Sequence, residues 1–280
     1  MRKKSILVTG SSGFIGSHLI DKIPHKTILF GKKDNLLSRE KVLQTKRVDV
    51  VIHLASKIPQ SNNKGKEGFF ENNVLGTLNI LEYCVKKRVE KLIFISSSIY
   101  GKPQYNPVNE KHPIMHNNPY TKSKILAEEL CKIYAEKYKI EIIILRPFNI
   151  FGNLQKDDSL ISNIIKSIKN NNNIKIINKN NKRDYLFIDD LIDAIIKLIN
   201  YKCEFEIFNI GSGKSYSFEN VIQLFEKRTK KKIIKQYKIS KKNNIPKIQV
   251  DISKIKKEIN WNPKYTLVEG IEKIILKNTK

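Results

Sequence analysis

Short apolar runs alternate with longer amphipathic stretches through the first two thirds of this 280-residue chain. Continuous Val, Ile and Leu runs are typical of strands that are buried on both faces. The runs that predict strands are SILVTG (5–10), KTILFG (26–31), VDVVIHLA (48–55), EKLIFISS (90–97) and IEIIILRPF (140–148). Between them, apolar positions spaced about 3.6 residues apart predict helices over 14–23, 71–87 and 119–138.

This order of elements predicts an α/β fold: a Rossmann-type doubly wound parallel sheet with a small mixed C-terminal lobe. In the last third, 189–200 and 217–228 predict helices, the second capped by Ser217, and 205–211 predicts a strand. The stretch NNIKIINKNNKRDY (172–185) predicts a hairpin that turns at Asn180-Asn181. We expect residues 1–148 with 186–210 to form the Rossmann domain, and 149–185 with 211–280 to form the lobe.

The composition changes this picture little. The net charge is +26, but the excess is almost all lysine spread along the chain, and only seven of the 53 basic residues are arginine. This distribution, without an arginine-rich stripe, predicts no specific nucleic-acid partner. The longest apolar run, Ile140–Leu145, is too short to cross a membrane, so no membrane insertion is predicted. Three widely spaced cysteines predict reduced thiols in a cytoplasmic protein, and no metal site.

A glycine-rich turn, VTGSSGFIG, joins the first predicted strand to the first predicted helix. Gly10, Gly13 and Gly16 allow a tight turn, a close approach of backbone to a pyrophosphate, and close packing of helix on strand. The free N–H groups at the helix start favour phosphate. In this position the pattern predicts a dinucleotide-binding site.

The end of the second predicted strand bears on which dinucleotide is bound. NAD-selective sites place an acidic residue there to bond the ribose 2′-hydroxyl. Here the strand ends ILFGKKD, with Gly31, Lys32 and Lys33 where the acid would stand. Two lysines can neutralise a 2′-phosphate, so the sequence favours NADP(H) over NAD(H).

Three tyrosines stand four residues ahead of a lysine, and a chain so rich in lysine produces such pairs by chance. The pairs are Tyr83/Lys87, Tyr120/Lys124 and Tyr237/Lys241. Only the second opens a helix next after the strand LIFISSS, and ligands in open α/β sheets sit beyond the carboxyl ends of strands. Ser96, Ser97 and Ser98 lie at that end. Tyr120 and Lys124 are therefore the candidate chemical pair.

The residue types suit proton transfer coupled to hydride transfer. A phenol with a pKa of about 10 is a poor base at neutral pH. A nearby ammonium group and an oxidised nicotinamide both favour the phenolate. Positions i and i+4 of a helix share one face, so Lys124 can act on Tyr120, while a serine hydroxyl holds the substrate oxygen.

With these motifs the chain resembles an extended short-chain dehydrogenase/reductase of the NAD-dependent epimerase/dehydratase family, which acts on nucleotide sugars. The resemblance covers nearly the whole chain, through blocks in family order: TGSSGFIGSHL, DVVIHLAS, ENNVLGTLNILE, FISSSIYG, YTKSK, LRPFNIFG, RDYLFIDDL, FNIGSGKSYSFENV and DISKIKKEINWNPKYTLVEGI. It implies an enzyme with Ser97, Tyr120 and Lys124 as the catalytic set, with Ser96 as a rival to Ser97. It implies a homodimer, a nucleotide-diphosphate sugar substrate, and a substrate-binding role for the lobe.

The same resemblance implies two sets of binding residues. The cofactor set is Gly10, Ser12, Gly13, Phe14, Ile15, Gly16, Leu54, Ala55, Asn73, Ser96, Tyr120, Lys124 and Pro147, to which the end of the second predicted strand adds Lys32 and Lys33. The substrate set is Ser98, Asn149 and Arg183, with the guanidinium suited to a pyrophosphate.

Departures from subfamily patterns narrow the expected reaction. Sugar 4,6-dehydratases carry an Asp-Glu pair where Ser98 and Ile99 stand, so dehydration is not expected. The 3,5-epimerase/reductases place cysteine at Ser98 and use a later histidine, which SLISNIIKSI does not supply. NADPH-dependent 4-keto reduction of a nucleotide sugar is favoured. The alternatives are a 4-epimerase of the UDP-glucose or UDP-N-acetylglucosamine type with tightly held NAD, and a catalytically silent sensor or scaffold.

Overall fold

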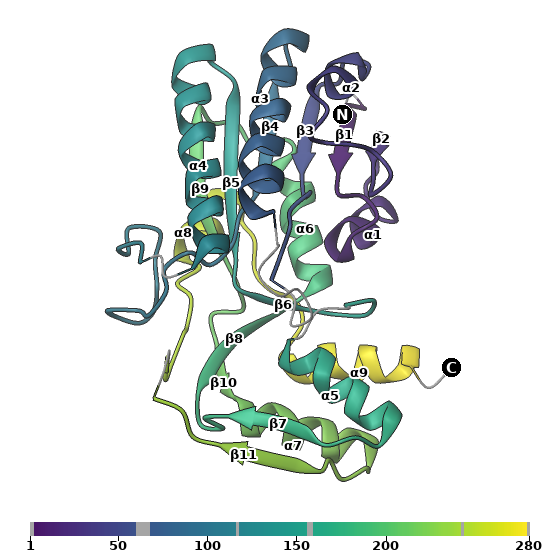
Figure 1. The fold of residues 1–280 in the computed structure, drawn as a ribbon, viewed down its shortest axis with the longest axis vertical. Helices are drawn as coiled ribbons and strands as arrows, with labels where there is room; N and C mark the ends of the chain where they lie inside the picture. The colour runs from purple at the N-terminus through teal and green to yellow at the C-terminus, as the bar shows by residue number, and fades with distance from the viewer. Residues whose placement is uncertain (1–2, 60–67, 116–117, 156–158, 242–243, 279–280) are drawn as a thin grey trace. The chain divides into compact units, whose positions relative to one another are not determined.

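A computed structural model of the chain describes residues 3–59, 68–115, 118–155, 159–241 and 244–278 (Figure 1). The chain divides into two compact units. Unit 1 comprises Met1–Gly101, Ile114–Pro147 and Ile192–Phe208. Unit 2 comprises Lys102–Pro113, Phe148–Leu191 and Asn209–Lys280. None of the helices in these described ranges is long and apolar enough to span a bilayer.

Unit 1 is built on a sheet with the strand order β2-β1-β3-β4-β5-β9. Its strands are β1 (Ser5–Thr9), β2 (Lys26–Phe30), β3 (Val50–His53), β4 (Lys91–Ile95), β5 (Glu141–Pro147) and β9 (Phe205–Ile210). The pairings from β2 to β5 are all parallel. The predicted doubly wound parallel sheet is thereby confirmed, because the five continuous apolar runs of the sequence are these strands.

Helices cover the sheet because each strand presents apolar side chains on both faces. Leu7, Val51 and Leu92 pack in one cluster with Ile80 of α3 (Gly76–Lys87) and Ala127 of α4 (Pro119–Tyr138). Fully burying each valine, leucine or isoleucine of this cluster contributes roughly 1.5–3 kcal/mol. The other helices with residues in unit 1 are α1 (Phe14–Ile20), α2 (Arg39–Gln44) and α6 (Ile188–Leu198), the last from Ile192 onward.

Lys91 of β4 is a buried charge on the opposite side of that strand from Leu92. Its ammonium donates to the carbonyl oxygens of Leu198 and Ile199 at 3.3 and 3.2 Å, and forms an ion pair with Glu141 at 3.2 Å. Unpaired carbonyls at a helix C-terminus attract cations. Lys91 therefore caps α6 and fixes that helix to the sheet.

The helix predicted over 71–87 begins with one wide turn, η1 (Phe70–Leu75), which has π-helical hydrogen bonding and continues directly into α3. The Thr77 hydroxyl donates to the carbonyl of Asn73 at 2.6 Å, so it satisfies an acceptor where the regular ladder is interrupted. Periodicity in the sequence does not separate this turn from α3.

Unit 2 contains two small sheets. One has the order β10-β8-β6, from β6 (Asn149–Phe151), β8 (Lys182–Phe187) and β10 (Ser215–Ser217). The other pairs β7 (Ile174–Ile177) with β11 (Lys235–Lys238) in parallel. The helices are α5 (Leu160–Asn170), α7 (Phe218–Thr229), α8 (Ser253–Ile259) and α9 (Leu267–Asn278). The predicted mixed lobe is present, and Ser217 caps α7 as expected by accepting from the Asn220 N–H at 3.0 Å.

The predicted hairpin over 172–185 is wrong. β7 pairs with β11 and β8 pairs with β10 and β6, so the two segments of the expected hairpin lie in different sheets. The left-handed residue of the connection is Asn178, with φ 54°, and not Asn180 or Asn181. The Asn178 amide donates to the Ser240 carbonyl at 2.8 Å, which ties the connection to the segment after β11.

Residues 102–113 belong to unit 2, although they fall within the range expected for the Rossmann domain. Val108 explains this placement, because it is fully buried and forms a parallel bridge with Val250. Its N–H donates to Gln249 O, and its carbonyl accepts from Asp251 N, both at 2.8 Å. A contact between segments so far apart in sequence leaves no local pattern.

Candidate active site

The glycine turn lies between β1 and α1, where the sequence predicts it. Gly10 has φ +68°, and a Cβ there would stand 2.7 Å from Ala55 N. A Cβ on Gly16 would stand 2.3 Å from Gly10 O. Gly13 is the N-cap residue of α1 and is exposed. The turn is therefore bare backbone on the side where α1 begins, flanked by the exposed Ser12 and the half-buried Phe14 and Ile15.

Three serines follow β4 directly, and their environments differ. Ser96 is buried, and its Oγ has no hydrogen-bond partner among the described residues. Ser97 is half-buried and its side chain forms a hydrogen bond with Tyr120. Ser98 is half-buried beside the fully buried Ile99. The structure thus brings Ser97 and Tyr120 together and leaves a buried hydroxyl next to them.

Tyr120 lies in the first turn of α4, which Asn118 caps by accepting from the Thr121 N–H at 2.8 Å. Its ring packs edge-on against Phe69, with 5.6 Å between ring centroids. Burial raises the pKa of the Tyr120 phenol, and the hydrogen bond from Ser97 opposes that rise. Without a bound cation the side chain is therefore a neutral phenol at neutral pH.

Lys124 lies one turn further along α4 and is almost fully buried. Its ammonium donates to the carbonyl of Ile95 at 2.8 Å and lies 4.3 Å above the centre of the Phe94 ring. Burial lowers the pKa of Lys124 to about 8, and the charge of Glu128 opposes that shift. The ammonium is held at the end of β4, directly behind the serines.

A buried ion pair that the sequence interpretation missed lies behind this lysine. Arg146 of β5 donates to both carboxylate oxygens of Glu128, with Nη2 to Oε2 at 2.6 Å, and Nη1 donates to the Tyr100 hydroxyl at 2.8 Å. Tyr120, Lys124 and Glu128 follow one another at i, i+4 and i+8 on α4. That charged stripe, and an arginine inside an apolar strand, are the signals that point to this pair.

The other two tyrosine–lysine pairs have no comparable setting. Tyr83 is fully buried, and its hydroxyl donates to the Lys46 carbonyl at 2.6 Å. Burial raises its pKa further above the ordinary value. Tyr237 is on β11, half exposed, and donates to Glu219 at 2.7 Å. Neither stands beside the serines after β4.

Charged side chains of both signs follow the end of β2. Lys32 and Lys33 are exposed, and the Lys32 N–H donates to Ser12 Oγ of the glycine turn at 3.0 Å. Asp34 folds back so that its carboxylate accepts from the Gly31 N–H at 2.6 Å. From the sequence, only lysines are expected at the position of the acid, because Asp34 comes three residues after Gly31 and lies outside the strand.

The remaining predicted cofactor residues lie in unit 1 and differ in their contacts. The N–H groups of Leu54 and Ala55 donate to Thr9, at 3.2 Å each, and Pro147 ends β5. The Asn73 amide is occupied by protein groups: Oδ1 accepts from Lys57 N at 2.7 Å, and Nδ2 donates to Ser123 Oγ at 2.9 Å. Its side chain holds a loop and α4 in place.

In unit 2, Asn149 and Arg183 line one cavity of 140 Å³ together with aromatic residues. Arg183 Nη1 donates to Ile245 O at 2.8 Å, and the guanidinium lies 5.3 Å from the Phe218 ring centre. Asn149 Nδ2 donates to the Asp184 carbonyl at 2.8 Å. Burial lowers the pKa of Arg183, which still leaves it a cation. The two predicted substrate residues of this unit therefore share a pocket with one positive charge.

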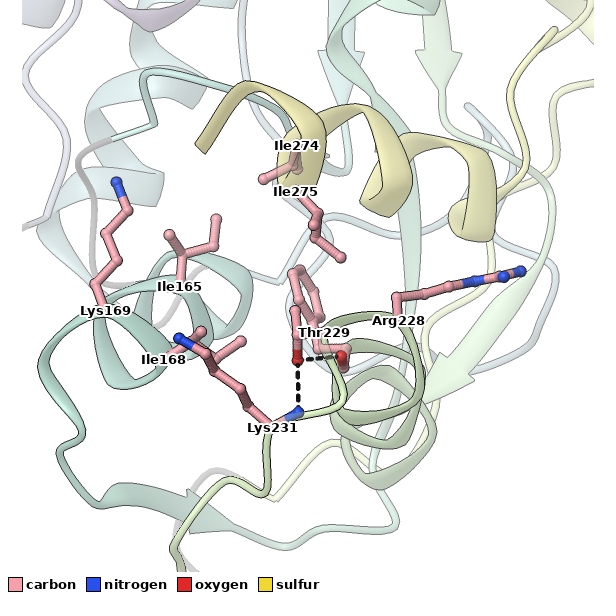
Figure 2. A pocket seen from close by; sticks show the side chains of 9 residues that line it. Ile165, Ile168, Lys169, Arg228, Thr229, Lys231, Ile274 and Ile275 are labelled. Atoms are coloured by element: carbon pink, nitrogen blue, oxygen red, sulfur yellow. Dashed lines mark hydrogen bonds between the residues drawn. The ribbon is translucent and has the colours of Figure 1, made fainter. Parts of the chain in front are cut away.

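A second cavity of unit 2, of 240 Å³, lies among α5, α7 and α9 (Figure 2). Its lining is largely isoleucine, including Ile165, Ile168 and Ile275. The Thr229 hydroxyl is engaged with Phe225 O at 2.8 Å, and Arg228 is paired with Glu272 at 3.0 Å. None of the predicted site residues lines this cavity, and the chemistry described above lies elsewhere.

Comparisons with known proteins agree with this geometry. The model of the NAD dependent epimerase/dehydratase family matches residues 6–211. A putative UDP-glucose 4-epimerase of Methanocaldococcus jannaschii is 33% identical, over 96% of this chain and 97% of that protein. A dTDP-4-dehydro-6-deoxyglucose reductase of Escherichia coli is 29% identical, over 98% and 97%.

Among solved structures, the UDP-glucuronic acid 4-epimerase of Bacillus cereus, in complex with UDP-glucuronic acid and NAD, superposes with a TM-score of 0.88 at 26% identity. The match covers 99% of this chain and all of that one. Sequence and fold thus agree over the whole chain. The protein is an enzyme and belongs to the NAD-dependent epimerase/dehydratase family, which includes nucleotide-sugar epimerases, dehydratases and reductases.

Proposed function

We propose that this enzyme is an NAD(P)-dependent oxidoreductase acting at C4 of a nucleotide-diphosphate sugar, and that it reduces a 4-keto sugar with NADPH. The observation that carries the proposal is the hydrogen bond between Ser97 and Tyr120. It lies at the carboxyl end of β4, next to the buried ammonium of Lys124, in the unit that also holds the glycine turn.

Two features of unit 1 fit a dinucleotide. A Cβ on Gly10 or Gly16 would collide with protein backbone, so both glycines let the turn pack closely, and α1 begins directly after the turn with its first N–H groups, as a pyrophosphate site requires. The buried Ser96 Oγ lacks a hydrogen-bond partner among the described residues, and a ligand group would satisfy it. When bound, the dinucleotide would supply or accept the hydride. The glycine turn, Ala55 and Pro147 would hold it.

The side chains of this chain would handle the proton. Tyr120 would donate it to the sugar oxygen at C4 during reduction, and Ser97 would hold that oxygen through its hydroxyl. The Lys124 ammonium would favour the phenolate that remains. In unit 2, Arg183 and Asn149 would bind the nucleotide-diphosphate portion, because a guanidinium presents paired donors to phosphate oxygens.

The test is an assay with two arms. In the first, the protein is incubated with NADPH and a panel of 4-keto nucleotide sugars, and NADPH absorbance is followed. In the second, UDP-glucose and UDP-N-acetylglucosamine are incubated without added cofactor, and the sugars are separated. Net loss of NADPH supports the reductase. If neither arm shows turnover and no dinucleotide copurifies, the proposal is wrong.

A 4-epimerase with tightly held NAD is the second candidate, because two observations favour it. The putative UDP-glucose 4-epimerase of M. jannaschii is 33% identical to this chain. The Asp34 carboxylate also lies at the end of β2, near the place where NAD-selective sites carry an acid. Redox-neutral interconversion in the second arm of the assay would select this function over reduction.

The charges after β2 give a prediction about cofactor choice. If Lys32 and Lys33 face the 2′-phosphate, the double variant Lys32→Ala/Lys33→Ala should weaken NADPH binding about 10- to 100-fold and leave NADH unchanged, since two charge-assisted contacts of ~1 kcal/mol or more are lost. Titration calorimetry with both cofactors measures this. Asp34→Asn is the matched change on the same turn, and it should weaken NADH alone if Asp34 bonds the ribose. Equal affinities in wild type, unaltered by the lysine changes, would contradict NADP preference.

The two serines are separated by a pair of alanine variants. Ser97→Ala should lower kcat about 10²-fold or more, because it removes a donor that holds the reacting oxygen. Ser96→Ala should leave kcat within about threefold and cost no stability, because a buried hydroxyl without a protein partner is no worse when replaced by a methyl group, but it should weaken dinucleotide binding if a ligand group bonds Ser96 Oγ. The reverse result would transfer the role to Ser96.

A further inference from the structure

A continuous chain of buried hydrogen bonds crosses unit 1, and its central member is His53. Thr9 Oγ1 lies 2.6 Å from His53 Nδ1, and His53 Nε2 lies 3.0 Å from Thr77 Oγ1. Thr9, His53 and Thr77 are each fully buried. The sequence interpretation treated this histidine only as part of an apolar run, so nothing described above gives it a role.

The donor and acceptor of each of these hydrogen bonds follow from the bonds at the two ends of the series. Thr77 has a single hydroxyl proton, which it donates to the Asn73 carbonyl at 2.6 Å. Thr77 must therefore accept from His53, so Nε2 carries the ring proton. Burial and, to a smaller extent, the charge of Lys124 lower the pKa of His53 to about 3, so the ring is neutral and Nδ1 is an acceptor. Thr9 donates to that atom and accepts from the Ala55 N–H at 3.2 Å.

The chain joins the segments to which the cofactor and the acid–base residue are assigned. Thr9 precedes Gly10, and it pairs directly with His53 across β1 and β3. On the other side, Asn73 bonds Ser123, whose hydroxyl donates to the Tyr120 carbonyl at 2.7 Å. The His53 ring also stacks on Phe94 at 5.6 Å, on the ring above which Lys124 lies.

We propose that His53, as the Nε2–H tautomer, is a positioning residue that fixes the glycine turn on one side and η1 with the catalytic helix α4 on the other. This inference rests on the proposed function for the roles of the two sides. It predicts that the two ring nitrogens serve different steps: Nδ1 serves dinucleotide binding through Thr9, and Nε2 serves turnover through Thr77 and Asn73.

Two variants separate the hydrogen bonds of the two ring nitrogens. In His53→Asn the amide oxygen stands near the place of Nδ1, so the Thr9 bond is kept and the Thr77 bond is lost. In His53→Gln the longer side chain reaches the place of Nε2, so the Thr77 bond is kept. We expect His53→Asn to lower kcat about tenfold with little change in Kd, and His53→Gln to raise Kd about tenfold with little change in kcat, as one lost hydrogen bond requires. Kd is measured with NAD⁺ and NADPH as probes.

The control is Val51→Ala, an apolar change at a fully buried position of the same strand. It should lower stability without separating kcat from Kd. A merely structural histidine would behave in the same way, with both His53 variants losing binding and turnover in parallel. That result, or no effect of either variant, would overturn the proposal.

A nuclear magnetic resonance measurement tests the tautomer without any activity. A ¹⁵N–¹H correlation through the ring protons distinguishes Nε2–H from Nδ1–H, and the signal missing in His53→Gln identifies His53. We expect a neutral Nε2–H ring from pH 5 to 9. A titration near the ordinary histidine pKa of about 6.5, or an Nδ1–H ring, would overturn the inference. If the wild type binds neither NAD⁺ nor NADPH, the proposed function is wrong. The tautomer of His53 can still be measured in that case, so the two inferences fail independently.

Discussion

Tyr120→Phe is expected to lower kcat by about 10²–10⁴-fold, the usual contribution of a positioned general acid or base. The change removes only the hydroxyl that bonds Ser97 and leaves the ring against Phe69. Affinity for the dinucleotide should therefore stay within about threefold of wild type, since the glycine turn is untouched and losses of that size are under 1 kcal/mol. Steady-state kinetics and titration calorimetry on the same preparation measure the two quantities.

Two matched tyrosines serve as controls for that variant. Tyr83→Phe removes a buried hydroxyl bonded to Lys46 O and should cost stability alone, and Tyr237→Phe removes an exposed hydroxyl and should cost neither stability nor activity. General acid–base catalysis contributes at least about 10²-fold to kcat. If Tyr120→Phe lowers kcat by less than about tenfold, Tyr120 is therefore not the proton donor.

The same pair gives a pH dependence with a definite sign. Below its pKa of about 8 Lys124 is an ammonium, whose charge would stabilise the phenolate formed when Tyr120 gives up its proton, and above that pH it becomes neutral. For the proposed reduction, which starts from the Tyr120 phenol and needs the Lys124 ammonium to stabilise the phenolate that remains, kcat/KM of the free enzyme should fall as pH rises through about 8. Since the charge of Glu128 raises the pKa of Lys124, replacing Glu128 should move this fall to lower pH. A pH profile that does not shift would contradict that coupling.

Glu128→Leu is expected to cost about 3–5 kcal/mol of unfolding free energy, because it leaves the buried guanidinium of Arg146 without its partner. Burial by itself would lower the pKa of Arg146, but the hydrogen bonds and charge of Glu128 raise it above the ordinary value. Arginine does not deprotonate in proteins, so the unpaired charge would stay buried. Chemical denaturation of wild type and variant measures the loss.

An exposed pair on the same helix provides the control. Lys132 and Glu136 are 3.9 Å apart, with both side chains more than 60% exposed. Glu136→Leu should change stability by no more than about 0.5 kcal/mol. The double variant Glu128→Leu/Arg146→Met should recover most of the single loss, because both charges are then gone. A Glu128→Leu protein as stable as the exposed-pair variant would show that the ion pair does not hold α4 to β5.

The sequence predicts the parts of this protein that depend on local periodicity. Five strands, the helix over 119–138 and the glycine turn follow from residues that are neighbours in sequence, and each lies where expected. The position of Tyr120 follows from its place after a strand end, because topology puts such ends at one edge of the sheet. Local pattern does not separate Ser96 from Ser97, since their difference is one of burial and hydrogen bonding.

The contacts that the sequence does not predict join distant segments. β7 pairs with β11 and not with its neighbour β8, because pairing partners are chosen by tertiary packing. The Glu128–Arg146 pair and the bond from His53 to Thr77 each connect separate elements. The position of the Asp34 carboxylate is not predicted either, because it returns to the strand end through a bend after Gly31.

The burial of Lys91 has a consequence for chemical labelling of this protein. Of 46 lysines in the chain, Lys91 and Lys124 have side chains about 1% exposed within the described ranges, and a surface rich in lysine surrounds them. An amine-acylating reagent should therefore modify the exposed lysines rapidly and reach these two only when unit 1 opens. Acylation of Lys91 reports release of the α6 end from β4, and acylation of Lys124 reports exposure behind the serines. The labelling rates of these two lysines thus measure local unfolding at two places in unit 1.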